Sequence, residues 1–141
     1  MRAIFDDTLI TGNEKIDTQH KELIERINKL LILCENEKPA QREAIDTLDY
    51  LADYTDFHFG EEEKLQEAVG YPGLAEHKKK HEELRQTVKE LHDMLEEQEG
   101  PTNAFVEKVN EKVTEWLYLH IRSFDRSVAE YIHLRDNEGR I

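Results

Sequence analysis

HFGEEEKLQEAVGYPGLAEHKKKH, residues 58–81, is the stretch of sequence that decides the fold. It predicts two helices joined by a tight turn at the GYPG segment, because Gly and Pro interrupt helices and favour turns. On each side of the turn, two potential metal ligands lie four positions apart, which places both side chains on one face of a helix. Such a pair can chelate one ion or bridge two. The pairs are His58 with Glu62 and His77 with His81.

The composition limits the classes of function open to the chain. Its 141 residues fit one compact domain with its own core. The net charge of -13, from 32 acidic and 19 basic residues, argues against a nucleic-acid partner and against an anionic membrane surface. No signal-peptide pattern is present, and no stretch has the ~20 apolar residues of a membrane span. Because the single Cys34 also fits a reducing compartment, we expect a cytoplasmic protein.

Apolar residues at helical spacing predict four helices and no strand. The first has Asp17 as its N-cap, and the next two cover residues 40–69 and 74–97. The fourth carries an apolar face from Phe105 to Phe124. The expected fold class is all-α, an antiparallel up-down-up-down four-helix bundle. Its expected parts are an irregular N-terminal arm (1–16), the bundle (17–133) and a polar C-terminal tail (134–141).

Ionisable residues fall on the inward face of every predicted helix. One buried histidine is ordinarily a core residue with a satisfied hydrogen bond. Several histidines and acids meeting in one interior do not fit that explanation, because buried charges need partners or a metal ion. We therefore predict a metal site with the ligands His20, His58, Glu62, His77, His81, His120 and Asp125.

The number of donor atoms favours two metal ions. If both carboxylates bridge, five imidazole nitrogens and four carboxylate oxygens give nine donors, and a solvent-derived bridge adds one donor to each ion. Two octahedral ions offer roughly twelve positions, so about one position stays open for a small ligand. Zinc normally takes four ligands and would be overfilled by this set.

Two details of spacing carry further predictions. His120 and Asp125 are five positions apart, which does not place them on a common face of a regular α-helix. We therefore predict a π-type widening or a kink between Ile121 and Asp125.

Glu61 and Glu63 fall beside the ligand stripe of the second predicted helix, and we expect both to point into solvent.

Four motifs resemble the hemerythrin family, in particular the single-domain bacteriohemerythrins. They are IDTQHKELI around His20, FHFGEEEKL around His58, YPGLAEHKKKHEEL around His77 and His81, and WLYLHIRSFD at the end. The resemblance extends from about Ile16 to Tyr131 and is specific as an ordered set of seven ligands.

The resemblance implies an oxo- or hydroxo-bridged, non-haem di-iron centre that binds dioxygen reversibly at one iron. By this resemblance His77, His81 and His120 hold the saturated iron, His20 and His58 hold the iron with the vacancy, and Glu62 and Asp125 bridge. The apolar ligand pocket that it implies consists of Leu23, Ile24, Phe59, Trp116, Leu117 and Ile121.

Two functions from different classes follow from this reading. The preferred one is a non-enzymatic oxygen-binding protein for the storage, delivery or sensing of dioxygen. The alternative is a di-iron redox enzyme that reduces oxygen or peroxide with electrons from a partner, or an oxygen-binding protein with such a side activity. Oxidases of the ferritin type use carboxylate-rich sites, so five histidines to two carboxylates favour oxygen binding. A monomer is the expected state, and the sequence names no electron donor or oxygen-accepting protein.

Overall fold

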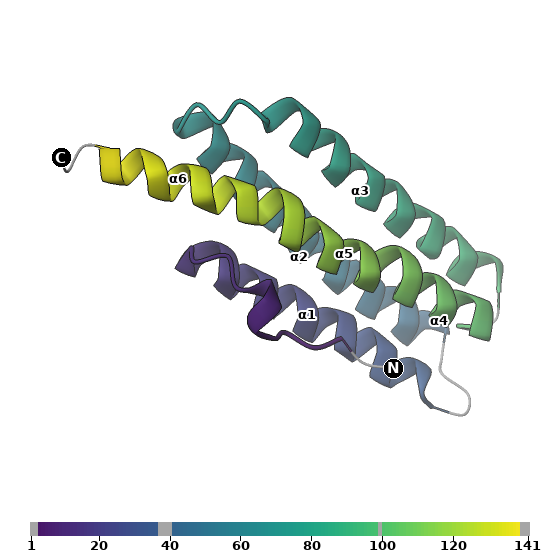
Figure 1. Cartoon of the computed structure of the whole chain (residues 1–141). Helices are drawn as coiled ribbons and strands as arrows, with labels where there is room; N and C mark the ends of the chain where they lie inside the picture. The colour runs from purple at the N-terminus through teal and green to yellow at the C-terminus, as the bar shows by residue number, and fades with distance from the viewer. Residues whose placement is uncertain (1–2, 37–40, 99, 139–141) are drawn as a thin grey trace.

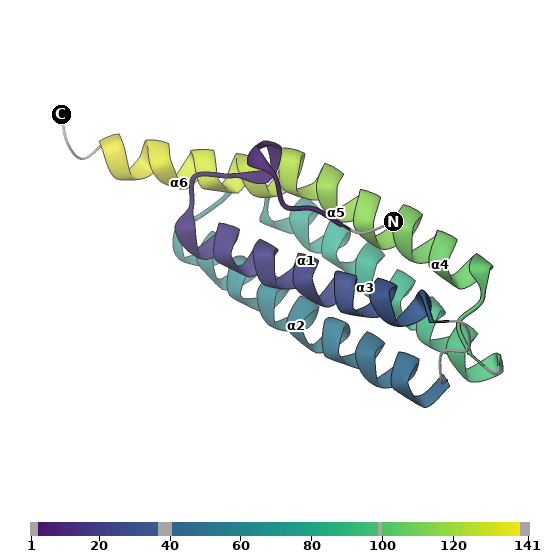
Figure 2. The same cartoon turned by 90° about the horizontal axis from the view of Figure 1, so that it is seen from below.

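The computed structural model describes residues 3–36, 41–98 and 100–138. All regular elements in these ranges are helical and form an antiparallel four-helix bundle, which confirms the predicted fold class (Figures 1 and 2). The first three bundle helices are α1 (Glu14–Cys34), α2 (Gln41–Ala68) and α3 (Leu74–Glu97). The fourth is a continuous helical stretch made of α4 (Asn103–Val109), η2 (Asn110–Thr114), α5 (Glu115–His120), η3 (Ile121–Asp125) and α6 (Arg126–Glu138). Ala40, the predicted start of the second helix, lies outside the described residues.

Helix α1 begins earlier than the sequence predicted. Its N-cap is Asn13, whose side chain accepts a hydrogen bond from the Ile16 N–H at 3.1 Å. The prediction that Asp17 caps this helix is therefore wrong. The Asp17 carboxylate instead accepts hydrogen bonds from the backbone N–H and the hydroxyl of Thr11, at 2.9 and 2.7 Å. Asn and Asp are both strong N-cap residues, so composition alone did not distinguish the two positions.

The turn between α2 and α3 brings the two ligand pairs face to face. Gly70 has φ of 67°, a left-handed conformation that costs little without a Cβ atom. The N–H of Tyr71 donates to the carbonyl of Gln66 at 2.9 Å, and the N–H of Gly70 donates to the carbonyl of Glu67 at 3.2 Å. These two bonds form a Schellman motif, which ends α2 and reverses the chain into α3.

Residues 3–13 of the predicted N-terminal arm lie across two bundle helices, and the last three residues of that predicted arm belong to α1. The arm contains the short 3-10 turn η1 (Asp7–Leu9), whose last residue is fully buried. On α1, the side chain of Asn28 exchanges two hydrogen bonds with the backbone of Ala3, at 2.7 and 2.8 Å. On α5, the Tyr118 hydroxyl accepts a hydrogen bond from the backbone N–H of Ile4 at 2.7 Å. The arm therefore ties the first bundle helix to the fourth.

The interior has two halves of different chemistry. The half away from the α2–α3 turn is apolar, and its fully buried side chains include Leu30, Ala44, Leu48, Leu91, Leu95, Phe105 and Val109. The half next to that turn holds the buried polar side chains of the predicted site. Across the described ranges, no helix combines the length and the apolar character that a bilayer span requires.

Candidate metal centre

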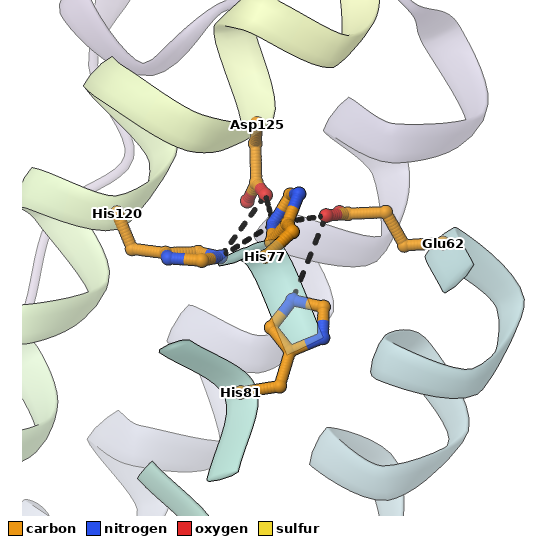
Figure 3. Close-up of side chains that lie close together, drawn as sticks. All are labelled: Glu62, His77, His81, His120 and Asp125. Carbon is orange, nitrogen blue, oxygen red and sulfur yellow. Dashed lines mark hydrogen bonds and ion pairs between the residues drawn. The ribbon is translucent and has the colours of Figure 1, made fainter. Parts of the chain in front are cut away.

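The structure brings all seven predicted ligand side chains together in the interior of the bundle. Each is at most 4% exposed. Their ring nitrogens and carboxylate oxygens form two groups, and within each group the ligand atoms lie within 4.8 Å of one another. Both groups contain Glu62 and Asp125. One group adds His77, His81 and His120, as Figure 3 shows, and the other adds His20 and His58.

His77 has the closest contacts in the group drawn in Figure 3. Its Nε2 lies 2.7 Å from Glu62 Oε1 and 2.9 Å from Asp125 Oδ1. The same nitrogen lies 2.9 Å from Nε2 of His120. Nitrogen and oxygen atoms from three bundle helices thus converge on one small volume, as the ligands of a metal ion do.

Several of these buried atoms make no hydrogen bond within the described part of the chain. His20 Nε2 lies 2.7 Å from Asp125 Oδ2, yet their relative direction is not that of a hydrogen bond. His81 Nε2 and Glu62 Oε2 are also buried without a hydrogen bond. Unsatisfied polar atoms are costly to bury. A metal ion among them would satisfy them, and imidazole with carboxylate is a donor set that suits iron.

The two carboxylates remain ionised in the interior. Burial and the nearby Asp125 would each raise the pKa of Glu62, but its close contacts with the rings of His58, His77 and His81 outweigh them and lower it to about 2. Burial likewise opposes ionisation of Asp125, while the adjacent His120 and His20 hold the pKa of its carboxyl well below the usual range. The centre therefore presents two negative charges to a bound cation.

The histidines around these carboxylates differ in their tendency to hold a proton. Burial lowers the pKa of His77, but hydrogen bonds to Asp125 and Glu62 raise it to about 9. For His81, burial prevails and lowers the pKa. Burial also opposes protonation of His20, but the charge of Asp125 prevails and raises the pKa of the ring. Without metal, the centre therefore attracts protons at the positions where metal ions would bind.

The helix widens where the sequence predicted a distortion. Residues Ile121–Asp125 form the π-helical segment η3, in which the N–H of Arg126 bonds to the carbonyl of Ile121, five residues back. This bonding places residues five apart about one turn apart, so Asp125 faces the same interior as His120. The predicted distortion is confirmed. A second π-helical segment, η2, was not anticipated by the sequence analysis.

Three side chains outside the predicted set contact the outer Nδ1 atoms of the histidines. Gln19 Oε1 lies 2.6 Å from Nδ1 of His58, and the Gln66 amide lies 2.8 Å from Nδ1 of His77. Glu63 Oε2 lies 2.8 Å from Nδ1 of His81, so the prediction that Glu63 points into solvent is wrong. Such contacts orient ligating histidines. Gln66 could have been found from the sequence, because it lies one turn beyond Glu62 on the same stripe.

Two aromatic side chains of the predicted pocket lie against candidate ligands. Of the predicted pocket residues, Trp116 is half-buried and the others are buried: Leu23, Ile24, Phe59, Leu117 and Ile121. The Phe59 ring stacks on His81, with the ring centroids 3.8 Å apart. The Trp116 ring stacks on His120 at 4.5 Å. The aromatic stacking covers the rings of two candidate ligands.

The fold and the site together define a class: helical-bundle proteins with a buried metal-binding cluster of histidines and carboxylates. The sequence profile described as hemerythrin HHE cation binding domain matches residues 11–132, which include all seven candidate ligands. The chain belongs to this hemerythrin family, in agreement with the resemblance of its motifs.

Similar proteins come from several bacteria and are named bacteriohemerythrin. The protein from Stenotrophomonas maltophilia is 33% identical over 136 residues, covering 96% of this chain and 84% of its own. The protein from Clostridium acetobutylicum is 30% identical over 131 residues, covering 92% of this chain and 98% of its own. A third, from Pseudomonas aeruginosa, is 32% identical over 129 residues, with 92% and 80% covered. The similarity thus extends over nearly the whole chain.

Proposed function

We propose that this chain binds dioxygen reversibly at a non-haem di-iron centre and serves the storage, delivery or sensing of oxygen. The observation that supports the proposal best is the pair of buried donor groups that share Glu62 and Asp125. Two shared carboxylates are what a pair of bridged ions requires, whereas a mononuclear site would leave one group of histidines without a role.

In the proposed centre, His77, His81 and His120 would hold one iron, His20 and His58 would hold the other, and Glu62 and Asp125, which belong to both groups, would be shared between the two. When bound, the iron pair supplies a vacant position and the two electrons that reversible dioxygen binding needs. Five imidazoles to two carboxylates favour binding over strong oxidative chemistry.

The surrounding side chains have two tasks in this proposal. The oxygens of Gln19 and Glu63 face Nδ1 of His58 and His81, and a hydrogen bond accepted from Nδ1–H leaves Nε2 of each ring free for a metal ion. The amide nitrogen of Gln66 contacts Nδ1 of His77 and holds that ring in place. The apolar pocket residues exclude water and withhold protons that would otherwise release the ligand as peroxide. Phe59, in contact with His81, and Ile121, at the start of η3, are fully buried.

Metal analysis with a visible spectrum through cycles of air and vacuum tests the proposal. We expect two irons per chain, and a spectrum that appears in air and disappears under vacuum repeatedly. His81→Ala should abolish both results. The matched control is His92→Ala on the same helix, because His92 is only half-buried and lies between the surface carboxylates of Asp49 and Glu96.

Two results would contradict the proposal. Purified protein that holds one metal ion or none after reconstitution with ferrous iron argues against a di-iron centre. Immediate, irreversible loss of the reduced form in air, with consumption of added peroxide, favours the redox-enzyme alternative.

A further inference from the structure

The outer hydrogen bonds of the candidate ligands are chemically unequal. His58 and His77 each face a neutral amide: the amide oxygen of Gln19 lies 2.6 Å from His58 Nδ1, and the amide nitrogen of Gln66 lies 2.8 Å from His77 Nδ1. His81 instead faces the carboxylate of Glu63, at 2.8 Å. Of these three contacts, only the one to His81 brings in a side chain that carries a full negative charge.

The position of Glu63 explains how a carboxylate reaches a buried ring. It follows Glu62 on α2, at the edge of the stripe that faces the interior, and its side chain is 19% exposed. At this edge α2 lies against α3, and the His81 ring has Nε2 near Glu62 and Nδ1 near Glu63. Glu63 therefore contacts the candidate ligand His81 without itself being one of the converging donors.

The Glu63 carboxylate also forms a long ion pair with Arg85. Arg85 Nη2 lies 3.9 Å from the same Oε2 atom that contacts His81. Arg85 is itself fixed by Asp56, at 2.9 Å from its Nε, and by Glu82, at 2.8 Å from its Nη1. Because the short contacts of Arg85 are with Asp56 and Glu82, the guanidinium group offsets the charge of Glu63 only weakly.

We infer that Glu63 is a positioning residue that lowers the reduction potential of the iron held by His77, His81 and His120. A hydrogen bond from Nδ1–H to a carboxylate makes imidazole a more basic ligand than a hydrogen bond to an amide does. A more basic, more electron-rich ligand stabilises the ferric ion relative to the ferrous ion, and the effect is larger in a buried site than in water. Glu63 thereby limits how long the reduced, oxygen-ready form persists. This inference rests on the proposed di-iron function.

Glu63→Gln tests the inference, because glutamine keeps the size and the acceptor oxygen and removes the charge. In a reductive titration of the iron-loaded protein against a redox mediator, each iron takes one electron from the mediator. We expect the equilibrium constant for reduction to rise on the order of tenfold, about 59 mV for a one-electron couple. Iron content should stay at the wild-type value.

The matched control is Glu61→Gln, two residues earlier on the same helix. It makes the same change in charge, but Glu61 pairs with Lys15 and Lys64, at 3.5 and 3.8 Å. We expect its equilibrium constant to stay within about twofold of wild type, since screened ion pairs with exposed lysines contribute little. Equal shifts in Glu61→Gln and Glu63→Gln would overturn the inference, because net charge alone would then explain both.

Glu63→Asp separates the hydrogen bond from the charge. Aspartate keeps the negative charge but is one methylene too short to reach His81, so we expect a shift in the same direction as Glu63→Gln and smaller. An aspartate variant equal to wild type would overturn the inference, even if the glutamine variant failed to retain iron. Wild-type protein without a di-iron centre would overturn the proposed function and this inference together. If wild-type protein binds and releases dioxygen through the air and vacuum cycles, and Glu63→Gln has the wild-type equilibrium constant for reduction, this inference alone is overturned.

Discussion

The same four helices enclose a polar cluster in one half of the bundle interior and an apolar core in the other. Next to the α2–α3 turn, the interior holds histidines and carboxylates whose Nε2 and oxygen atoms crowd together with incomplete hydrogen bonding. At the far half, leucines with Phe105 and Val109 fill the space at essentially zero exposure. Burial of apolar side chains stabilises a fold, whereas burial of polar side chains costs free energy unless they are satisfied. The comparison therefore predicts that the far half maintains the fold and that the near half depends on its metal.

Metal removal should produce the largest difference between the halves. Iron at a thousand times its dissociation constant stabilises the fold by ~4 kcal/mol, and chelation removes that contribution. In hydrogen exchange, we expect amides around His58 and His77 to exchange faster than those around Leu48 and Leu91 in the metal-free protein. In the iron-loaded protein the two sets should become similar. Equal exchange of both sets without metal would contradict the comparison.

Leu91→Ala should weaken the far half directly. Leu91 is fully buried, and removing its side chain leaves a cavity that costs about 2–5 kcal/mol in the free energy of unfolding. Urea unfolding measures this loss, while the folded fraction should still bind two irons. The control is Leu119→Ala, which removes a leucine that is 67% exposed and should change stability by less than about 0.5 kcal/mol. A loss of iron as large as the loss of stability would show that the halves are not separable.

Gln66→Leu should affect the near half at nearly constant volume. It removes the 2.8 Å contact with His77, and loss of such an outer hydrogen bond typically lowers metal affinity by about 10–100-fold. Competition with a chelator measures the affinity. The exposed Gln86 on α3 offers the control, since Gln86→Leu makes the same chemical change away from the centre. Unchanged affinity in Gln66→Leu would mean that His77 is oriented by packing alone.

The smallest expected effect is the pH dependence of the metal-free protein. The pKa of His77 is raised from 6.5 to about 9, so its stabilisation is complete below pH 6.5 and is lost as the pH rises toward about 9. The pKa of Glu62 is lowered from 4.5 to about 2, so its stabilisation is complete above pH 4.5 and is lost as the pH falls toward about 2. Urea midpoints across this range should fall at both ends.

A matched variant distinguishes the two ends of the pH profile. Glu62→Gln removes the titrating carboxyl, and we expect the acid loss to become shallower. The alkaline loss should also shrink, because Glu62 contributes to the raised pKa of His77. A profile that is flat from about pH 2 to about pH 9 in the unaltered protein would mean that the carboxylates and rings do not interact as their distances indicate.

Features that depend only on the spacing of side chains along one helix could be predicted from the sequence. The inward positions of His58, Glu62, His77 and His81 follow from spacing, as does the distortion that brings Asp125 inward. Relations between helices could not be predicted in this way. Glu63 lies at the edge of its stripe, and only the approach of α3 decides whether such a side chain meets water or a neighbouring ring.

Local chemistry also left some choices open. Asn13 and Asp17 are equally suitable caps, and the arm decides between them because Thr11 engages the carboxylate of Asp17. The η2 segment has no anomalous ligand spacing to reveal it, in contrast to η3. Sequence periodicity thus located the candidate ligands better than it located the contacts that orient them.

The π-helical segment η3 contains one residue more than a regular α-helical turn needs. The exposed Ser123 lies within this segment. Deleting that serine would return the turn to i, i+4 bonding and still leave the aspartate about one turn after His120. Evolution could therefore gain or lose a residue here without losing the centre. When relatives are aligned, a one-residue gap at this point should be accepted, so that the aspartates are matched by their place in space and not by their distance along the chain.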